Sequence, residues 1–211
     1  MMVFIKRLYK LIFELDLFFF LYEKYSLFKG FLQVLIIKTF YFNRFEIGSN
    51  YKIWGNIRFL FWGNGKIKIG DNFHCVSSEK RSFLTLFSKC HLTVIENGSI
   101  KIGNNVGLNG TTIVSKKNIF IGDRTMIAPN TIIMDYDGHV SWPLEERWTN
   151  QGISKEIIIE NDVWIGLNCV ILKGVTIKSG SIIGPGSVVI NNVESNSLYA
   201  GNPAKKIKDL F

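Results

Sequence analysis

Branched apolar residues recur every six positions through the C-terminal part of the chain. Six consecutive hexads run from residue 159 to residue 194, and each opens with isoleucine or valine. These opening positions are Ile159, Ile165, Ile171, Ile177, Ile183 and Val189. A period of six fits neither the 3.6 of an α-helix nor the 2 of a flat strand. It predicts a solenoid of short strands in which three strands complete one triangular coil of about 18 residues.

The same pattern begins earlier, in four related segments. They read IKIGDN, IKIGNN, IFIGDR and IIIEND, and they open at Ile67, Ile100, Ile119 and Ile157. The solenoid is therefore predicted to start near residue 50. The last two segments lie 38 residues apart, and because one coil takes about 18, roughly 20 residues must leave the coil as a loop. The predicted loop, residues 138–155, is polar, aromatic and charged, as functional loops often are.

Residues 1–47 differ from the rest of the chain and are dense in aromatic side chains. Apolar residues fall on one face of a predicted helix, namely Phe4, Leu8, Leu11, Ile12, Leu15, Phe18 and Phe19. Glu14 and Asp16 interrupt the apolar runs, so we predict neither a signal peptide nor a transmembrane helix. Two interpretations stay open: a helical cap on the open end of the solenoid, or an interfacial membrane anchor. The second predicted domain spans residues 48–211.

Composition and net charge limit the classes of molecule that this chain is expected to bind. A chain of 211 residues with 47% apolar content can bury one core. Its net charge of +8 favours an anionic partner, such as a cofactor phosphate or an acidic polymer. The basic residues are scattered and form no known nucleic-acid-binding motif, so nucleic acid is not expected. Cys75, Cys90 and Cys169 are odd in number and lack metal-ligand spacing, which favours buried thiols in a reducing compartment.

Three segments together resemble the hexapeptide-repeat acyltransferases, and in particular the branch that O-acetylates bacterial polysaccharides. They are IIMDYDGHV, VWIGLNCVILKGVTIKSGSIIGPGSVV and AGNPAKKIK. The resemblance covers about residues 50–211. It implies an all-β solenoid, a left-handed parallel β-helix, which we expect to follow an N-terminal helical segment and to end in a short C-terminal helix. It also implies a homotrimer, with acetyl-CoA bound in the groove between neighbouring coils.

The resemblance places His139 at the catalytic centre, at the foot of the extruded loop. This histidine stands where the hexad pattern breaks, just after Asp135 and Asp137 in a DxDxH arrangement. Acetyl transfer to a hydroxyl needs a base that removes the hydroxyl proton, and neutral imidazole has a pKa near working pH. We therefore expect His139 to be the general base. Either aspartate is expected to orient the imidazole, as in a hydrolase triad, or to cap the first turn of the loop.

Two further residues are expected close to this histidine. The resemblance implies that Trp164 lies beside the histidine and the pantetheine arm of the cofactor. Its indole N–H, or a backbone N–H of the coil, is then the candidate donor to the developing oxyanion. Packing of this large ring at a seam between subunits is the alternative. Asn109, one coil earlier, is expected to contact the acceptor hydroxyl, because related acetyltransferases use an asparagine near this place.

The end of the chain is expected to bind the nucleotide part of the cofactor. Residues 201–209 resemble the stretch with which the family grips the nucleotide phosphates, and Lys205 and Lys208 stand where relatives often carry arginine. Gly184 allows a thin pantetheine chain to approach the backbone closely. Pro185 occupies a place where many relatives have alanine beside the pantetheine.

The loop is expected to select the acceptor. Trp142, Trp148 and Arg147 suit stacking on a sugar and pairing with a carboxylate, and Glu145 and Glu146 suit binding of hydroxyls. Asp137 is also expected among the substrate-binding residues. The predicted enzyme is an acetyl-CoA-dependent O-acetyltransferase acting on a bacterial cell-surface glycan. A capsule or O-antigen, including a sialic-acid polymer, fits the basic charge, and the predicted location is the cytoplasm, at the inner face of the membrane. A small-molecule or sugar-nucleotide acetyltransferase of the same fold is the alternative.

Two other classes are less favoured. Some left-handed β-helices are zinc carbonic anhydrases with three converging histidines, and this chain has three histidines. His74 and His91 are 17 residues apart, close to one coil, and are therefore expected to stack on one face. His139 is too far along the solenoid to join them within one chain, so no metal site is predicted. A non-catalytic scaffold is the last alternative, and acetyl-CoA would not raise its melting temperature.

Overall fold

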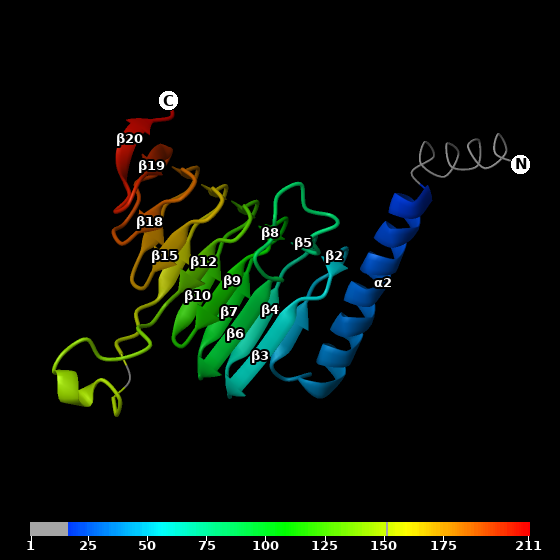
Figure 1. The fold of residues 1–211 in the computed structure, drawn as a ribbon, viewed down its shortest axis with the longest axis horizontal. Helices are drawn as coiled ribbons and strands as arrows, with labels where there is room; N and C mark the ends of the chain where they lie inside the picture. Colours follow the sequence, from blue (N-terminus) through cyan, green and yellow to red (C-terminus); the bar gives the residue numbers. More distant parts are fainter. Residues whose placement is uncertain (1–16, 151) are drawn as a thin grey trace, which may run out of the picture.

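The computed structural model describes residues 17–150 and 152–211, and these form a three-sided parallel β-helix preceded by one long helix (Figure 1). The first sheet consists of β1 (Phe45–Ile47), β4 (Lys66–Ile69), β7 (Ser99–Ile102), β10 (Asn118–Ile121), β13 (Ile157–Ile159) and β16 (Thr176–Ile177). The second consists of β2 (Lys52–Gly55), β5 (His74–Ser77), β8 (Gly107–Asn109), β11 (Met126–Ile127), β14 (Trp164–Ile165), β17 (Ile182–Ile183), β19 (Ser197–Ala200) and β20 (Lys205–Asp209). The third consists of β3 (Arg58–Gly63), β6 (His91–Glu96), β9 (Thr112–Ser115), β12 (Ile132–Met134), β15 (Val170–Leu172) and β18 (Val188–Val189).

The hexad positions point inward and stack in register, as predicted. Ile121 aligns with Ile159 in the next coil, and Ile159 aligns with Ile177 in the coil after that. Ile127, Ile165 and Ile183 align in the same way in the second sheet. These six side chains are at most 3% exposed. The core is therefore a column of branched apolar residues, and each coil buries its inner face against its neighbours.

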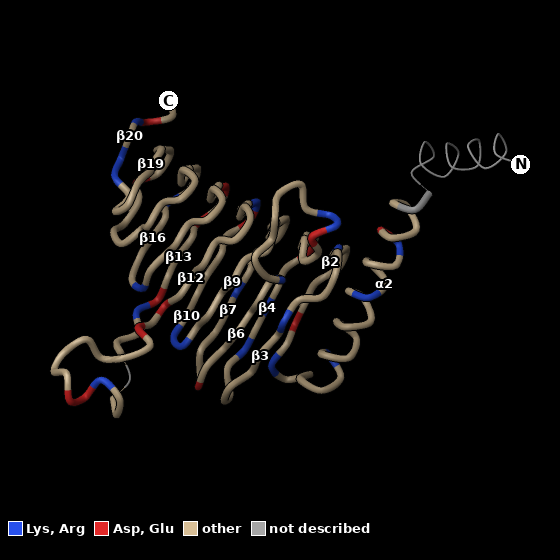
Figure 2. Tube along the Cα trace, viewed as in Figure 1, with Lys and Arg blue, Asp and Glu red and all other residues tan. Residues whose placement is uncertain are grey.

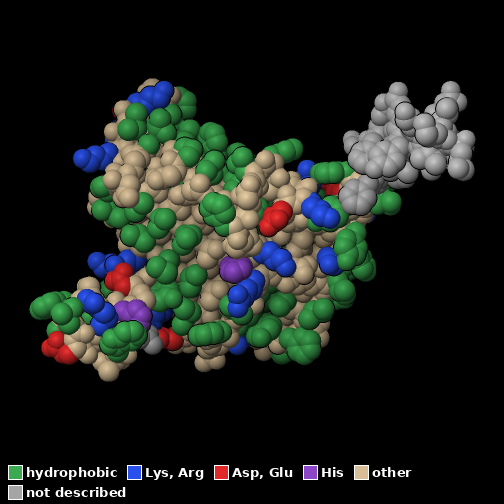
Figure 3. Space-filling view, in the orientation of Figure 1, with side chains coloured by type: hydrophobic (Ala, Val, Ile, Leu, Met, Phe, Trp, Pro, Cys, Tyr) green, Lys and Arg blue, Asp and Glu red, His purple; other side chains and the backbone are tan. Residues whose placement is uncertain are grey.

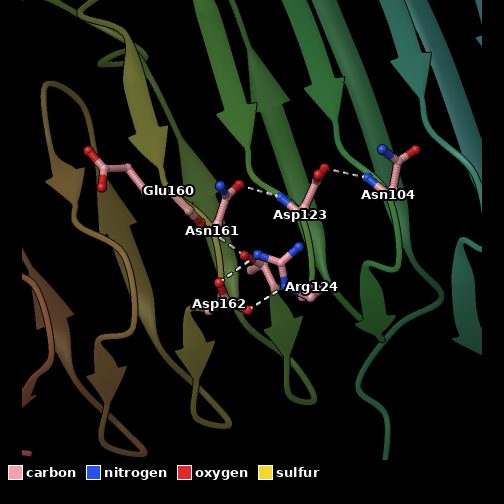
Figure 4. A network of polar contacts seen from close by, with 7 residues as sticks. Asn104, Asp123, Arg124, Glu160, Asn161 and Asp162 are labelled. Atoms are coloured by element: carbon pink, nitrogen blue, oxygen red, sulfur yellow. Dashed lines mark hydrogen bonds and ion pairs between the residues drawn. The ribbon is translucent and has the colours of Figure 1, made fainter.

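Side-chain hydrogen bonds join neighbouring coils at one corner of the prism (Figure 4). They explain why the four related segments IKIGDN, IKIGNN, IFIGDR and IIIEND each carry an acidic or amide residue at this corner. One polar residue in each coil has a side-chain oxygen that accepts a backbone N–H of the preceding coil, at 2.6 to 2.8 Å. These residues are Asp71, Asn104, Asp123 and Asn161. At the next position, Arg124 and Asp162 form a two-bond ion pair of 2.6 and 2.7 Å. The acidic or amide residue of each segment thus joins neighbouring coils.

Two segments leave the coil, and only one was predicted. The expected loop separates β12 from β13, and an antiparallel bridge between Tyr136 and Ser154 closes its foot. A second loop, residues 78–90, separates β5 from β6. Asn130 anchors this second loop, because its Oδ1 accepts the Phe87 N–H at 2.9 Å and its Nδ2 donates to the Thr85 carbonyl at 3.0 Å.

The helix α2 (Leu17–Phe40) lies against β2 at the first coil (Figure 1). Val34 is buried in the core, and a Cβ on Gly30 would clash with the Ile53 carbonyl, so glycine permits the close approach. Most of the expected helical face, Phe4 to Leu15, lies outside the described residues, as does the side chain of Phe18. Among the residues described, no helix is long and apolar enough to cross a membrane. Membrane attachment stays a prediction.

The predicted C-terminal helix is wrong. Residues 205–209 form β20, which pairs antiparallel with β19 and so ends the second sheet. The physical reason is the free edge of β19, whose backbone groups need partners after the last coil. This pairing satisfies them and also closes one end of the solenoid, a role that helix propensity in KKIKD does not reveal.

The three cysteines are buried and unbridged, as predicted. Burial raises the pKa of the Cys75 and Cys169 thiols, which keeps them protonated at neutral pH. They therefore serve the fold as small apolar side chains.

Candidate active site

His139 lies on the long loop, and its ring has a defined backbone partner. Its Nδ1 is 2.9 Å from the carbonyl oxygen of Arg147. A carbonyl only accepts hydrogen bonds, so Nδ1 carries the proton and Nε2 keeps a lone pair. The Trp148 ring packs edge-on against the imidazole, with 5.9 Å between ring centroids. The local fold therefore selects the tautomer in which Nε2 is the unprotonated nitrogen whenever the ring is neutral.

A short helical turn brings Arg147 back to His139. The turn η1 (Leu144–Glu146) follows Pro143, and the Arg147 N–H bonds to the Leu144 carbonyl. The Arg147 guanidinium also donates to the Ser141 carbonyl at 3.0 Å. The tip of this loop carries acidic and basic residues side by side (Figure 2). Trp142 and Trp148 are 74% and 87% exposed, so both rings are available for contacts outside the chain.

The two aspartates before His139 have other partners than the imidazole. Asp135 is fully buried, and its carboxylate accepts the Ser115 hydroxyl and the N–H groups of Lys116 and Lys117 at 2.7 to 2.9 Å. Asp137 forms an ion pair of 2.6 Å with Lys173. Within the described residues, neither carboxylate bonds to the His139 ring. The Asp135 carboxylate therefore neither orients the imidazole nor caps the first turn of the loop, and it instead joins the foot of the loop to β9 and the turn after it.

Asn109 lies at the end of β8, in the second sheet. Its Nδ2 is 3.4 Å from the Ser82 hydroxyl on the 78–90 loop, and its Oδ1 is buried without a partner among the described residues. A buried amide oxygen without a partner costs free energy, so this site suits a donor supplied from outside. The sequence prediction of an acceptor contact at Asn109 stays a prediction.

Trp164 lies on a different side of the prism from His139. Trp164 opens β14 in the second sheet, where it aligns with Met126 and Ile182, and its side chain is 50% exposed. The His139 loop leaves the prism between the third sheet and the first, at the corner opposite the second sheet. Figure 1 shows this loop standing away from the body of the prism. One chain therefore does not bring the two predicted catalytic residues together.

Small residues follow one another across the end of the second sheet. A Cβ on Gly184 would lie 2.9 Å from the Ala200 Cβ, and a Cβ on Gly166 would lie 2.7 Å from the Pro185 backbone N. The row ends at Lys205, which aligns with Ala200 on β20. These glycines allow the coils of this sheet to pack closely, and the expected contact of Gly184 and Pro185 with pantetheine stays a prediction.

The lysines of β20 have distinct roles. Lys206 pairs with Glu194 and Asp209 at 2.7 Å each, and hydrogen bonds to these two carboxylates raise its pKa. Lys205 and Lys208 are exposed and form no ion pair with the described residues. Figure 2 shows the basic residues of β20 at the end of the prism. Lys205 and Lys208 are therefore the cations available to phosphates.

The expected stacking of His74 and His91 is wrong. His74 lies on β5 in the second sheet and His91 on β6 in the third, because the 78–90 loop takes up the intervening residues. Burial lowers the pKa of both, with Lys52 beside His74 and Arg58 beside His91 adding to the effect. In the described part of the chain, no three histidine, cysteine or acidic side chains gather in a way that would hold a metal ion.

Comparisons with known proteins agree with this architecture. The family model described as bacterial transferase hexapeptide (six repeats) matches residues 156–191. Galactoside O-acetyltransferase of Escherichia coli is 34% identical over 161 residues, which cover 69% of this chain and 77% of that protein. A putative lipopolysaccharide biosynthesis O-acetyl transferase of Escherichia coli is 30% identical over 154 residues, covering 69% and 72%.

A solved structure of a galactoside acetyltransferase in complex with coenzyme A has a TM-score of 0.56 and 29% identity. The match covers 84% of this chain and 69% of that one. The shared fold, the hexads and the length of the sequence matches point to one conclusion. The chain belongs to the hexapeptide-repeat acyltransferases of left-handed parallel β-helix fold, and it is an acetyltransferase.

Proposed function

We propose that this chain transfers an acetyl group from acetyl-CoA to a hydroxyl of a bacterial cell-surface glycan, with His139 as general base. The observation that carries the proposal is the bond between His139 Nδ1 and the Arg147 carbonyl, which leaves Nε2 as a base on an exposed loop. O-acetyltransferases among the relatives, including one named for galactosides and one for lipopolysaccharide biosynthesis, support the reaction type.

The chemistry follows from the tautomer of His139. Nε2 removes the proton from the acceptor hydroxyl as the oxygen attacks the thioester carbonyl carbon. The C–S bond of the tetrahedral intermediate then breaks, and the thiolate takes the proton back from the imidazolium. The Arg147 carbonyl holds the ring in one orientation throughout. The Trp164 indole N–H is the donor that we assign to the oxyanion, because its half-exposed side chain has no hydrogen-bond partner among the described residues.

The donor site that we propose lies at the C-terminal end of the second sheet. Gly184 and Pro185 would lie along the pantetheine arm, and Lys205 and Lys208 would pair with the nucleotide phosphates. The small residues of this row and the two uncompensated lysines fit a thin chain that ends in anionic groups. Trp164, on the same sheet, would lie beside the thioester end.

The active site in this proposal is shared between copies of the chain. His139 and Trp164 belong to opposite sides of one prism, so they converge only when the loop of one copy reaches the second sheet of another. A ring of identical copies with such head-to-tail contacts closes naturally as a cyclic oligomer. We therefore propose a homotrimer around a threefold axis, in which each site lies between two neighbouring copies.

The loop and the net charge support an acidic glycan as acceptor. Exposed Trp142 and Trp148 offer flat surfaces to sugar rings, and Arg147 offers a guanidinium to a carboxylate. A capsule or O-antigen, including a sialic-acid polymer, has this chemistry, and its assembly would place the enzyme in the cytoplasm at the inner membrane face. The Asp137 carboxylate is half exposed beside Lys173 and could still accept a sugar hydroxyl.

The direct test is mass spectrometry of candidate glycans after incubation with acetyl-CoA. Acidic polysaccharides, neutral O-antigen fragments and sugar nucleotides are compared at equal concentration, with the His139→Ala variant as control. The proposal expects an alkali-labile acetyl ester on a polysaccharide, formed by the wild type alone. Acetylation of sugar nucleotides without any polysaccharide product would favour the alternative acceptor class and overturn the glycan assignment.

A further inference from the structure

A pocket lies between α2, the end of β2 and the 78–90 loop. Its volume is about 590 Å³, and its lining includes Ser26, Lys29, Lys80 and Lys89. Sites for small ligands typically have volumes of about 300–1,000 Å³. Neither the loop nor the pocket was predicted from the hexad pattern, and no proton-transfer or acyl-transfer step proposed above uses the residues that line the pocket.

One hydroxyl in this pocket is buried without a partner. Ser26 is 2% exposed, and its Oγ forms no hydrogen bond with the described residues. Serine inside a helix usually bonds to its own backbone or faces water. A buried hydroxyl that does neither costs free energy unless a bound molecule supplies its partner. Ser26 therefore points to a ligand in the pocket.

The lysines in the lining of this pocket favour an anionic ligand. Lys29 and Lys89 line the pocket together with Lys80, and Glu79 is the acidic residue among the described lining residues. Lys29 Nζ lies over the Tyr25 ring at 4.7 Å, and Lys80 Nζ lies over the Tyr22 ring at 5.1 Å, so two of the cations are held at its walls. Lysines placed in this way attract a phosphate or a carboxylate.

The neutral groups of the lining suit a sugar. Besides Ser26, the lining includes Ser78, Ser88 and Asn56. Hydroxyls and amides both donate and accept hydrogen bonds, as sugar hydroxyls require. The Tyr22 hydroxyl bonds to the Ser78 hydroxyl, which ties the helix to the loop across the pocket. The lining thus contains both lysines and neutral hydrogen-bonding groups.

The same loop connects the pocket to a proposed acceptor contact. Ser78 and Lys80 line the pocket, and Ser82, two residues further on, lies 3.4 Å from the Asn109 amide. We propose that this pocket is a second binding site that holds an anionic sugar unit of the acceptor. The proposal rests on the glycan acceptor proposed above. It would let the enzyme hold a glycan at two points along the prism.

The test measures binding directly, without acetyl-CoA. Glucuronic acid, glucose 1-phosphate, glucose and inorganic phosphate are titrated into the full chain by calorimetry. We expect at least one of the two anionic sugars to bind more tightly than glucose and than phosphate. Preference for glucuronic acid indicates an acidic polymer, and preference for glucose 1-phosphate indicates a phosphate-linked sugar. Equal affinity for glucose, or for inorganic phosphate, would overturn the proposal.

Variants locate the binding in the pocket. Ser26→Ala removes one hydrogen bond without adding volume and should weaken binding of the preferred anionic sugar about threefold to tenfold. The double variant Lys29→Met and Lys89→Met should weaken it at least about tenfold. Lys178→Met, at an exposed position on a distant coil, is the matched control and should bind as the wild type does.

The outcomes separate this proposal from the proposed acetyl transfer. His139→Ala should keep the binding and lose the transfer, since His139 lies outside the pocket. Unchanged affinity in both Ser26→Ala and the double lysine variant overturns the second site alone. If the wild type acetylates none of the polysaccharides but still binds the anionic sugar, the acetyl-transfer proposal is overturned instead.

Discussion

The Nδ1 of His139 lies 2.9 Å from the backbone carbonyl oxygen of Arg147, eight residues further along the loop. This bond fixes the tautomer of the imidazole and leaves Nε2 as the basic nitrogen. The acceptor is a backbone atom, so it survives any side-chain substitution at Arg147. A carboxylate would instead add negative charge beside the ring and raise the pKa of the imidazole.

Replacing His139 by alanine should lower acetyl transfer at least roughly a hundredfold, because the hydroxyl would lose its base. Arg147→Ala is the control, since it retains the carbonyl that holds the imidazole. It should keep kcat within about threefold, while the KM for an acidic acceptor rises about threefold to tenfold. Steady-state kinetics of both variants measure these effects. Near-normal turnover by His139→Ala would remove this residue from the mechanism.

The ion pair between Asp137 and Lys173 joins the foot of the loop to β15 and its following turn. Asp137→Ala and Lys173→Met should each reduce kcat/KM, because the loop loses one attachment. The double variant should be little worse than either single variant, with a coupling of about 0.5–3 kcal/mol. A double-mutant cycle on acetyl transfer measures this. Strictly additive effects would show that Asp137 acts independently, for example by binding the acceptor.

Asp135 should matter for stability more than any other acidic residue of the loop region. Asp135→Ala leaves the Ser115 hydroxyl and two backbone N–H groups without their acceptor. The expected loss is about 1–3 kcal/mol or more, measured by urea unfolding. Glu145→Ala, an exposed truncation in the same loop, should change stability by less than about 0.5 kcal/mol. Equal stabilities of the two variants would contradict the anchoring role.

Acid should weaken the contact between the neighbouring coils that Arg124 and Asp162 join, because it protonates the Asp162 carboxylate. The hydrogen bond from Arg124 lowers the pKa of Asp162 below its ordinary value of 3.8. Because the pKa of this carboxyl is lower in the folded chain than in the unfolded chain, its ionised form stabilises the fold at pH values above the unfolded-state pKa. This contribution is lost as the pH falls through the folded-state pKa. Asp162→Asn should therefore lower the melting temperature at neutral pH but not at about pH 2. A constant difference between the two proteins across this range would contradict this account.

The hexad period was sufficient to predict the solenoid because inward positions are limited in space and repeat in every coil. The 38-residue gap between Ile119 and Ile157 likewise predicted the loop that carries His139. The 33 residues between Ile67 and Ile100 carried the same signal for the 78–90 loop, and this signal was missed. The strand β20 was less predictable, since it forms only in response to the free edge of β19.

Contacts at the candidate site depended on tertiary structure. The DxDxH pattern marked the region but not the division of roles, because Asp135 finds its donors on the strand β9 and the turn after it. The partner of His139 is a backbone carbonyl, which any residue type supplies, so the sequence carries no signal for it. The opposite placement of His139 and Trp164 likewise became visible only with the order of the three sheets.

The most direct test of a site shared between copies mixes two inactive variants. His139→Ala and Trp164→Ala are purified separately and also co-expressed with different tags, and mixed oligomers are isolated through both tags. Each mixed assembly can form a site with an intact histidine from one copy and an intact tryptophan from the next. In a trimer each mixed assembly holds one such intact site out of three, so we predict recovery of about one third of wild-type acetyl transfer. Mixed oligomers that stay as inactive as the two parent variants would contradict the account.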